Sequence, residues 1–443
     1  MNMMNWRQLL SAQRFGSRTR QTEQARSPFH KDHDRIVFSA SFRRLNRKTQ
    51  VHPLARNDQV HTRLTHSLEV ACVGRTLGQL CGELLADALP PEISTADVGA
   101  IIQSACLAHD IGNPPFGHAG EYAIRDWFLQ PAQGALLAQL SLAQAHDLCN
   151  FEGNAQGLRI LTQTEHHPFQ GGMRLTFATL GAYLKYPWTG NVEHLSTKMP
   201  KFGCYLAEAT VLEEIASALG LLPAGSLRWC RHPLAYLMEA ADDICYALID
   251  LEDGLEMDIL PYEAIEPVLL EFLRDAEIPY ELQLSASTPA HKIAALRGAA
   301  FNVLVQAVAH TFIAHQQALL NGEFSGSLLD HCPAHLTHGI NAAKTLARQR
   351  IFNNPRKAQI ELGAYSTLGI LLEQFIAASL ATLENRELSF RHRRLQDLLE
   401  TQVSQPADCA YACCLRAIDF IASLSDHHAT ELAQSFSGRI VGD

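Results

Sequence analysis

The segment CLAHDIGNPPFGHAGE, residues 106–121, ends an apolar helical run with a His-Asp pair and then interrupts the backbone at once. The run leading into it, STADVGAIIQSACLAHD (residues 94–110), opens with a Ser-Thr pair, and either residue is a suitable N-cap. The glycine and two prolines that follow are typical of a helix end. We therefore expect His109 and Asp110 at a helix terminus beside an irregular loop, where reactive groups are commonly displayed.

Apolar residues recur at helical spacing along most of the chain, and strand-like alternation is scarce. Helices are expected over residues 65–89, 233–257, 290–317, 340–350, 365–380 and 412–424. Pro233 opens the second of these, at a position where its missing N–H costs nothing. Irregular stretches are expected near residues 164–174, 188–202, 329–339 and 352–355. The pattern predicts an all-α fold with room for a small β-hairpin near the middle of the chain.

Composition places the chain among soluble globular proteins, with 47% hydrophobic and 19% charged residues in 443. A chain of this length buries a substantial core without disulfides, so we expect cysteines such as Cys72, Cys81, Cys106 and Cys245 to be buried small apolar residues. The N-terminus has no apolar signal region, and no apolar run looks long enough to span a bilayer. The expected location is cytoplasmic, with no membrane partner.

Charge is distributed unevenly along the chain. The net charge is -10, yet the segment from Arg7 to Lys48 contains eleven Lys and Arg residues and only three Asp and Glu residues. A solvated or salt-bridged segment is the ordinary interpretation of such a run. The alternative is a surface that meets phosphates, either of nucleotides or of nucleic acid.

Two further residues give the His-Asp pair a chemical context. On its own the pair is explained by its helix end, where a histidine is electrostatically favoured. His66 lies in the preceding helical segment, and Asp242 lies within the apolar run YLMEAADDICYALI. An ionised carboxylate in such surroundings is costly unless it is paired or bound to a metal. Two imidazoles and two carboxylates would suit Mg²⁺ or a divalent transition metal.

Histidine, His-Asp and aspartate in this order resemble the HD-domain metal phosphohydrolases. Longer blocks resemble the bacterial deoxynucleoside triphosphate triphosphohydrolases of the dGTPase type. These blocks are RIVFSASFRRLNRKTQV (35–51), HTRLTHSLEV (61–70), HDIGNPPFGHAGE (109–121), FEGNAQGLRIL (151–161), LGAYLKYP (180–187) and YLMEAADDICYALIDLED (236–253). The resemblance implies an HD-domain helical core over 61–255, preceded by a basic segment (1–60) and followed by a helical region (256–443) packed on the core as one structural unit.

The resemblance also implies a metal site. Its ligands would be His66, His109, Asp110 and Asp242, holding Mn²⁺, Mg²⁺, Co²⁺, Ni²⁺ or Fe²⁺. Asp242 is chosen because the family places its ligand at the first acid after the alanines. Helix geometry agrees, since Asp243 would turn about 100° away from Asp242.

The implied reaction is attack of water on the α-phosphorus of a dNTP, which releases a deoxynucleoside and intact triphosphate. By resemblance His118 and Glu121 form a catalytic pair close to that water, in which the carboxylate orients the imidazole. Without the family, both residues would be interpreted as an ordinary helix start. Whether His118 acts as base, acid or nucleophile is left open.

Further residues are expected by resemblance to bind substrate. Phosphate contacts are expected from Arg63, Lys185 and Lys201, and Tyr186, next to Lys185 in the same block, is expected to bind substrate. Gln50, Tyr246 and Asp250 are expected to hold the sugar 3'-hydroxyl and to fill the space that a 2'-hydroxyl would need. Asp242, Tyr246 and Asp250 would share one helix face, since they are spaced by four residues. The ordinary alternatives are a solvated arginine, a core tyrosine and an exposed acid.

The chain also departs from the family pattern. His427 and His428 stand where relatives commonly have arginine and an aromatic residue, which leaves base preference and assembly open. The resemblance implies a homo-oligomer, with a hexamer as one arrangement, and allows a regulatory dNTP or single-stranded nucleic acid. Alternative functions are an HD-domain phosphohydrolase of nucleoside monophosphates or signalling nucleotides, and a regulator that binds nucleotides or single-stranded nucleic acid.

Overall fold

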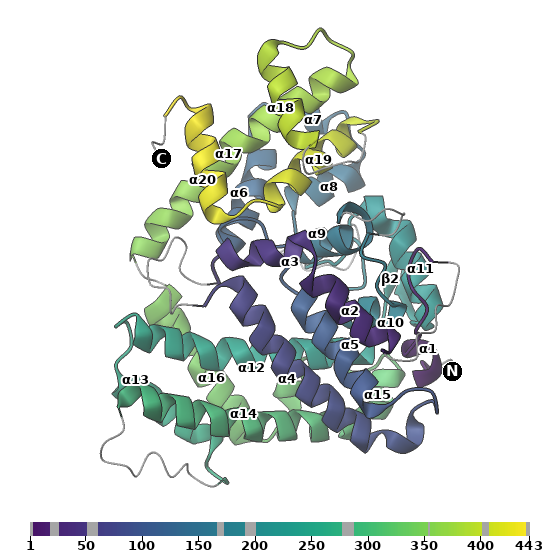
Figure 1. Ribbon diagram of the computed structural model, residues 1–443, viewed down its shortest axis with the longest axis vertical. Helices are drawn as coiled ribbons and strands as arrows, with labels where there is room; N and C mark the ends of the chain where they lie inside the picture. Colours follow the sequence, from purple (N-terminus) through teal and green to yellow (C-terminus); the bar gives the residue numbers. More distant parts are fainter. Residues whose placement is uncertain are drawn as a thin grey trace.

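The fold is all-α, as predicted, and Figure 1 shows helices throughout the molecule. The computed structural model describes residues 3–17, 26–50, 61–165, 172–190, 201–276, 288–352, 355–400 and 407–439. Within these ranges the only sheet is the antiparallel pair β1 (Pro223–Gly225) and β2 (Arg228–Trp229), which confirms the hairpin expected near the middle of the chain.

The helices follow one another with short connections. The α-helices are α1 (Trp6–Leu9), α2 (Pro28–Val37), α3 (Ala40–Arg44), α4 (Arg63–Leu84), α5 (Thr95–Ala108), α6 (Gly117–Leu129), α7 (Gly134–Leu137), α8 (Leu142–Cys149), α9 (Gly153–Arg159), α10 (Phe177–Tyr183), α11 (Ala209–Leu219), α12 (Pro233–Glu256), α13 (Tyr262–Phe272), α14 (Pro289–Ala314), α15 (Gln316–Leu320), α16 (Ala334–Ala347), α17 (Pro355–Leu383), α18 (Phe390–Glu400), α19 (Ala410–Ala422) and α20 (Asp426–Phe436). Short 3₁₀ turns are η1 (Leu45–Arg47), η2 (Ala86–Ala88), η3 (Pro131–Gln133), η5 (Leu206–Glu208) and η7 (Leu328–His331), and π turns are η4 (Ile160–Thr164) and η8 (Arg348–Phe352).

The helices α4 and α5 pack closely because glycines face each other between them. A Cβ placed on Gly78 would lie 2.7 Å from the Cα of Gly99, and a Cβ on Gly74 would lie 2.4 Å from the Sγ of Cys106. These separations leave no room for a side chain. The glycines therefore set the spacing of the two helices that carry the predicted histidine ligands.

The helix α12 crosses the middle of the core and packs on α4, α5, α10, α14 and α16. Pro233 is its first residue, as predicted, and the ring of His232 accepts a hydrogen bond from the N–H of Leu234. The buried Nε2 of His232 faces the carbonyl of Leu9, which ties the N-terminal segment to this helix start. A long buried helix held at its N-terminus is a rigid support for side chains such as Asp242.

Two hydrophobic clusters divide the interior. The larger one joins the N-terminal segment, α4, α5 and α10 to α16, and the smaller one joins α6 and α8 to α17, α19 and α20. Figure 1 shows α17 to α20 at the top of the molecule, above α4, α5 and α12 to α16. The division of the sequence at residues 60 and 255 remains a prediction.

Several expectations about individual elements need correction. The stretch 329–339 was expected to be irregular, but α16 begins at Ala334, where Leu336 and Ile340 are buried at helical spacing. The helix expected from residue 365 begins at Pro355. Cys72 is exposed on α4, whereas the other three cysteines named above are buried. Much of the irregular stretches expected at 164–174 and 188–202 lies outside the described residues.

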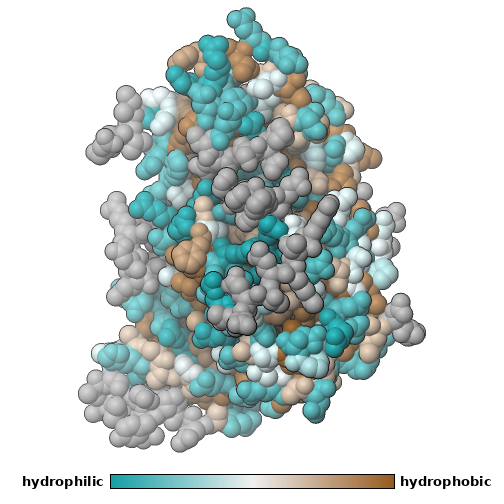
Figure 2. All heavy atoms as spheres, turned by 45° about the vertical axis from the view of Figure 1, so that its right-hand side comes forward, coloured by the Kyte–Doolittle hydropathy of each residue, from teal (hydrophilic) through white to brown (hydrophobic). Residues whose placement is uncertain are grey.

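Two helices, α14 and α17, are long and apolar enough to cross a membrane by length and composition, contrary to expectation. Both pack against several other helices of the same chain, and core helices of globular proteins pass the same test. On the coloured part of the face in Figure 2, hydrophobic residues are interspersed with hydrophilic ones. The cytoplasmic location remains a prediction.

The basic N-terminal segment is partly engaged with the rest of the protein. Arg14 forms an ion pair with the buried Asp32 at 2.5 Å, and Arg35 donates to the carbonyls of Met173 and Arg174. Residues 18–25 lie outside the described residues. For the arginines described here, the salt-bridged interpretation of the charge run fits the contacts.

Candidate active site

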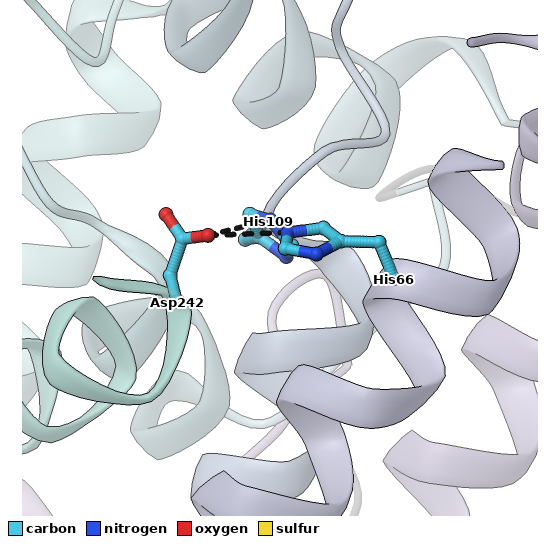
Figure 3. Close-up of side chains that lie close together, drawn as sticks. All are labelled: His66, His109 and Asp242. Carbon is cyan, nitrogen blue, oxygen red and sulfur yellow. Dashed lines mark hydrogen bonds and ion pairs between the residues drawn. The ribbon is translucent and has the colours of Figure 1, made fainter. Parts of the chain in front are cut away.

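Three side chains from three helices meet at one point. His66 on α4, His109 at the end of α5 and Asp242 on α12 place one nitrogen or oxygen each within 4.8 Å of one another. The Oδ1 of Asp242 lies 3.2 Å from Nε2 of His66 and 3.6 Å from Nε2 of His109 (Figure 3). Two imidazole nitrogens and a carboxylate form a donor set that suits a divalent metal.

Helix ends fix both histidines. Thr62 caps α4 in a reciprocal capping box with Thr65, which places His66 in the first turn of the helix. The Nδ1 of His109 lies 2.6 Å from the carbonyl oxygen of Cys106. Because a carbonyl only accepts hydrogen bonds, Nδ1 of His109 carries the proton, and its Nε2 is left as an acceptor or ligand.

Asp110 lies at the edge of this cluster. Its Oδ1 is 3.5 Å from Nε2 of His109, and its Oδ2 receives a hydrogen bond of 2.6 Å from Nη1 of the buried Arg63. Asn113 donates to Oδ1 from its side chain. Burial alone would raise the pKa of Asp110, but the charge of Arg63 outweighs it and lowers the pKa to about 2. Asp110 is therefore an ionised carboxylate that is already paired on one side.

The two adjacent acids of α12 point in different directions. Asp242 faces the histidines, and although burial opposes its ionisation, His109 and His66 lower its pKa below the usual range. Asp243 instead accepts a hydrogen bond of 2.9 Å from Lys344 on α16. Of these two acids, only Asp242 belongs to the cluster in the structure.

A second pair, His118 and Glu121, opens α6. His118 is largely exposed, with 77% of its side chain accessible, and its Nδ1 lies 2.9 Å from the buried carboxylate of Glu121. The other oxygen of Glu121 accepts a hydrogen bond from the N–H of Gly153. Burial would raise the pKa of Glu121, but the hydrogen bond with His118 and the charges of Lys201 and Arg125 lower it to about 2. Glu121 is thus suited to orient the His118 ring.

Comparisons with known proteins agree with this arrangement. The HD domain family matches residues 63–187. Deoxyguanosinetriphosphate triphosphohydrolase-like proteins of Pseudomonas aeruginosa and Synechocystis sp. are 51% and 40% identical, each over 98% of this chain and 99% of their own length. A deoxyguanosinetriphosphate triphosphohydrolase of Enterobacter sp. is 36% identical over 78% of this chain and 76% of its own length.

The chain belongs to the deoxyguanosinetriphosphate triphosphohydrolase-like family of HD-domain proteins. The resemblance found in the sequence is thereby confirmed. HD domains are metal-dependent hydrolases, and His66, His109 and Asp242 are a candidate metal site in this member of the family. The match of the HD domain covers both histidines and ends before Asp242.

The expected phosphate-binding cations of this family member are held by acids. Lys185, next to Tyr186, forms an ion pair of 3.1 Å with Glu239, which also pairs with Arg231 at 2.8 Å. Burial would lower the pKa of Lys185, but Glu239 raises it, so the ammonium stays charged. Lys201 is 3.1 Å from Glu152.

The residues expected around the sugar lie on two segments that meet near the cluster. A single antiparallel bridge between Thr49 and Thr62 brings the segment that contains Gln50 beside the start of α4. Tyr246 and Asp250 follow Asp242 along α12. The charges of Asp242 and Arg63 both act on Tyr246, whose pKa is raised mainly by burial.

Several of these side chains carry buried polar atoms without a hydrogen-bond partner among the described residues. They are Oε1 of Gln50, Nε of Arg63 and Oδ2 of Asp250. Burial raises the pKa of Asp250 well above its usual range. Buried polar groups in folded proteins are nearly always paired, and a bound ligand is one source of the missing partners.

The sequence did not single out Glu152 and Arg125. Arg125 lies 3.4 Å from Glu152 and 4.0 Å from Glu121, so it links the two carboxylates. Burial raises the pKa of Glu152, and the negative charge of Glu121 adds to this effect. Glu152 stands within the block FEGNAQGLRIL, and an acid amid apolar residues was the available signal.

The two histidines that depart from the family pattern are exposed. His427 and His428 lie in the first turn of α20, and the backbone N–H of His428 donates to the Ser425 cap. Neither side chain belongs to the metal cluster. Their effect on base preference and assembly remains open.

Proposed function

We propose that this protein hydrolyses dNTPs, dGTP or several of them, to a deoxynucleoside and inorganic triphosphate, by attack of water at the α-phosphorus. The observation that carries the proposal is the convergence of His66, His109 and Asp242 beside the buried Arg63. The names of the relatives support a nucleoside triphosphate as substrate. A cluster that can hold a divalent cation next to a buried guanidinium suits a phosphate group.

His66, His109 and Asp242 would hold the metal ion, and the Oδ1 of Asp110 would complete the set. The bound ion, one of Mn²⁺, Mg²⁺, Co²⁺, Ni²⁺ or Fe²⁺, would lower the pKa of water and offset the charge of an α-phosphate oxygen. The donor set fits such an ion, because Nε2 of both imidazoles and a carboxylate oxygen of Asp242 lie within 4.8 Å of one another. Arg63 holds Asp110 in place through its hydrogen bond.

His118 is proposed to exchange the proton of the reaction. Its Nδ1 donates to the ionised Glu121, which leaves Nε2 free to accept or deliver a proton at the exposed side of the ring. Glu121 is held in turn by the N–H of Gly153 and by the charge of Arg125. The pair thus keeps one tautomer of His118 oriented before substrate binds.

Cations and polar groups would bind the rest of the nucleotide. Arg63, Lys185 and Lys201 would offset the charge of the leaving triphosphate, with Tyr186 beside Lys185. Gln50, Tyr246 and Asp250 would bind the sugar 3'-hydroxyl, since Gln50 and Asp250 carry buried oxygens without a partner in the part of the chain that the structure describes. A deoxyribose that pairs these oxygens would leave no room for a 2'-hydroxyl.

The test is product analysis with each dNTP and each NTP. The protein would be stripped of metal and resupplied with Mn²⁺ or Mg²⁺, and products would be separated by ion-exchange chromatography. We expect deoxynucleoside and triphosphate from dNTPs, nothing from NTPs, and loss of turnover in His109→Ala. Pyrophosphate or monophosphate products would instead point to another phosphohydrolase, and no turnover with any metal would point to a nucleotide-binding regulator.

Assembly and regulation follow from the same proposal. The family resemblance implies a homo-oligomer, with a hexamer as one arrangement, and a regulatory dNTP or single-stranded nucleic acid as an additional ligand. Binding of single-stranded DNA in rising salt tests the nucleic acid, because phosphate contacts weaken with salt. No binding at low salt would exclude it.

A further inference from the structure

The loop between α5 and α6 has an unfavourable backbone conformation. Phe116 and Gly117 are consecutive residues with positive φ values of 65° and 56°. Glycine tolerates this region, but phenylalanine with its Cβ does not adopt it without support from its surroundings. The loop joins His109 and Asp110 to His118 and Glu121, so its shape sets the distance between the two halves of the proposed site.

Support for this loop comes from the far end of the chain. Asp426, the first residue of α20, is 1% exposed, and its Oδ1 accepts a hydrogen bond of 2.9 Å from the N–H of Phe116. Its Oδ2 accepts from the N–H of Thr49 at 3.1 Å and from the Thr49 hydroxyl at 2.5 Å. One carboxylate thus holds the loop before α6 and the residue next to Gln50.

Lys48 forms a second link between the loop and the C-terminal helices. The buried ammonium of Lys48 donates to the carbonyl of Asn113 at 2.7 Å and to the carbonyl of Ala422 at the end of α19. The Asn113 side chain in turn donates to Asp110. The end of α19 is therefore linked to the loop through Lys48, and the start of α20 contacts the loop directly through Asp426.

Asp426 does not have the role of an ordinary helix cap. Ser425 already caps α20, since its hydroxyl accepts from the N–H of His428. Both carboxylate oxygens of Asp426 instead accept from segments that are remote in sequence, at Thr49 and Phe116. Burying this carboxylate removes it from water, which is unfavourable, and its hydrogen bonds to the two remote segments compensate for that loss. These hydrogen bonds fix the positions of the two segments.

We propose that Asp426 is a positioning residue, whose carboxylate holds Phe116 and Thr49 so that His118 and Gln50 face the metal cluster in the productive geometry. The expected effect on turnover rests on the proposed function. The effect on the conformation of the loop does not rest on it, because that effect concerns only hydrogen bonds within the chain.

The experiment compares Asp426→Ala with Asp32→Ala. Asp32 is a matched control, because it is also fully buried and accepts from the N–H and hydroxyl of one threonine, Thr176, on the side of α2 and α10. Four quantities are measured for each variant: kcat, KM, Mn²⁺ binding by calorimetry, and hydrogen exchange of peptides covering residues 111–121.

We expect Asp426→Ala to lower kcat by about 100-fold, the loss typical of a misplaced reacting group. KM should rise, because Thr49 and the neighbouring Gln50 are no longer held. Mn²⁺ stoichiometry should stay near the wild-type value, and exchange at residues 111–121 should rise on the order of 10-fold. Asp426→Asn should recover part of kcat, because its carbonyl oxygen still accepts from the N–H of Phe116. Asp32→Ala should lower thermal stability without a comparable loss of kcat.

Two results would overturn the proposal. One is unchanged exchange at residues 111–121 in Asp426→Ala, which stays measurable even if the wild-type protein hydrolyses no nucleotide. The other is a loss of kcat in Asp32→Ala as large as in Asp426→Ala, because the effect would then follow general destabilisation. If Asp426→Ala does not fold, Asp426→Asn takes its place, because its amide keeps the volume and leaves only one oxygen to accept from Phe116 and Thr49, and the same readouts apply.

Discussion

At the scale of single residues, Arg63 lies between Asp110 and the start of α6. Its Nη1 forms an ion pair with Asp110. Its Nη2 lies close to Gly117, only 2.5 Å from where a Cβ on that residue would be. Its Nε has no hydrogen-bond partner among the described residues. A planar guanidinium can serve several acceptors at once, whereas an ammonium is a single point of charge. The same residue can therefore hold Asp110 and still face a phosphate.

Arg63→Lys should for this reason lower kcat/KM by about 100-fold, the loss typical of one missing charge-stabilising donor. The measurement is steady-state hydrolysis of the preferred dNTP. Arg75→Lys, an exposed position on the same helix, is the control and should keep wild-type activity. Equal activity in both variants would contradict a role for Arg63 in phosphate binding.

His118→Gln removes the proposed proton-exchanging group and leaves the metal cluster untouched. We expect kcat to fall by about 100-fold or more, as is usual for loss of a general acid or base. Mn²⁺ binding, measured by calorimetry, should be unchanged, because His118 is not part of the cluster. A variant with wild-type kcat would leave His118 as an ordinary exposed residue at a helix start.

At the scale of elements, the start of α4 is tied to α12 by His61. Its Nδ1 lies 2.6 Å from Asp253 and its Nε2 lies 3.2 Å from Glu69. Burial acts to lower the pKa of His61, but the hydrogen bonds to Asp253 and Glu69 outweigh it and raise the pKa to about 10. The two elements that carry His66 and Asp242 are thus joined by an ion pair.

A pH-dependent stability follows from this pair. A histidine whose pKa is raised in the folded state stabilises fully below its unfolded pKa of about 6.5, and the contribution is lost as pH rises through about 10. The melting temperature of the wild type should therefore fall more steeply between pH 6.5 and 10 than that of His61→Gln. Parallel curves for the two proteins would show that the pair contributes nothing.

Local signals explain which elements the sequence could predict. Ser94 and Pro233 act within their own first turns, so the starts of α5 and α12 were readable from a few residues. The start of α16 was missed, because Ala334 begins a helix whose burial depends on packing against α12 and α13. Asp426 and Phe116 are 310 residues apart in the sequence, so no local sequence pattern could predict their hydrogen bond.

At the scale of the whole molecule, a buried ionic network joins the two hydrophobic clusters. Arg159 at the end of α9 pairs with Asp419 on α19 at 2.8 Å and with Glu208 at 2.5 Å, and Gln156 donates to the same aspartate. The C-terminal helices are therefore attached to the core by polar contacts as well as by apolar packing. The sequence predicted the attachment without identifying these residues.

Asp419→Ala should destabilise the protein by about 3 kcal/mol, because it leaves Arg159 buried with one carboxylate partner removed. The measurement is urea denaturation followed by circular dichroism. Asp397→Ala removes an exposed ion pair with Arg394 in the same region and should change stability little. Similar small losses in both variants would show that the buried network does not hold the two clusters together.

The position of Asp426 after every candidate metal ligand in the sequence also has a consequence for biosynthesis. During translation, every candidate metal ligand leaves the ribosomal tunnel well before Asp426, whose carboxylate supports the α5–α6 loop, is synthesised. A nascent chain that has not yet reached α20 contains the candidate metal ligands but lacks the carboxylate that supports the α5–α6 loop. Under our proposal such a chain hydrolyses nucleotides slowly, and turnover reaches its full rate only after α20 has been synthesised and has packed.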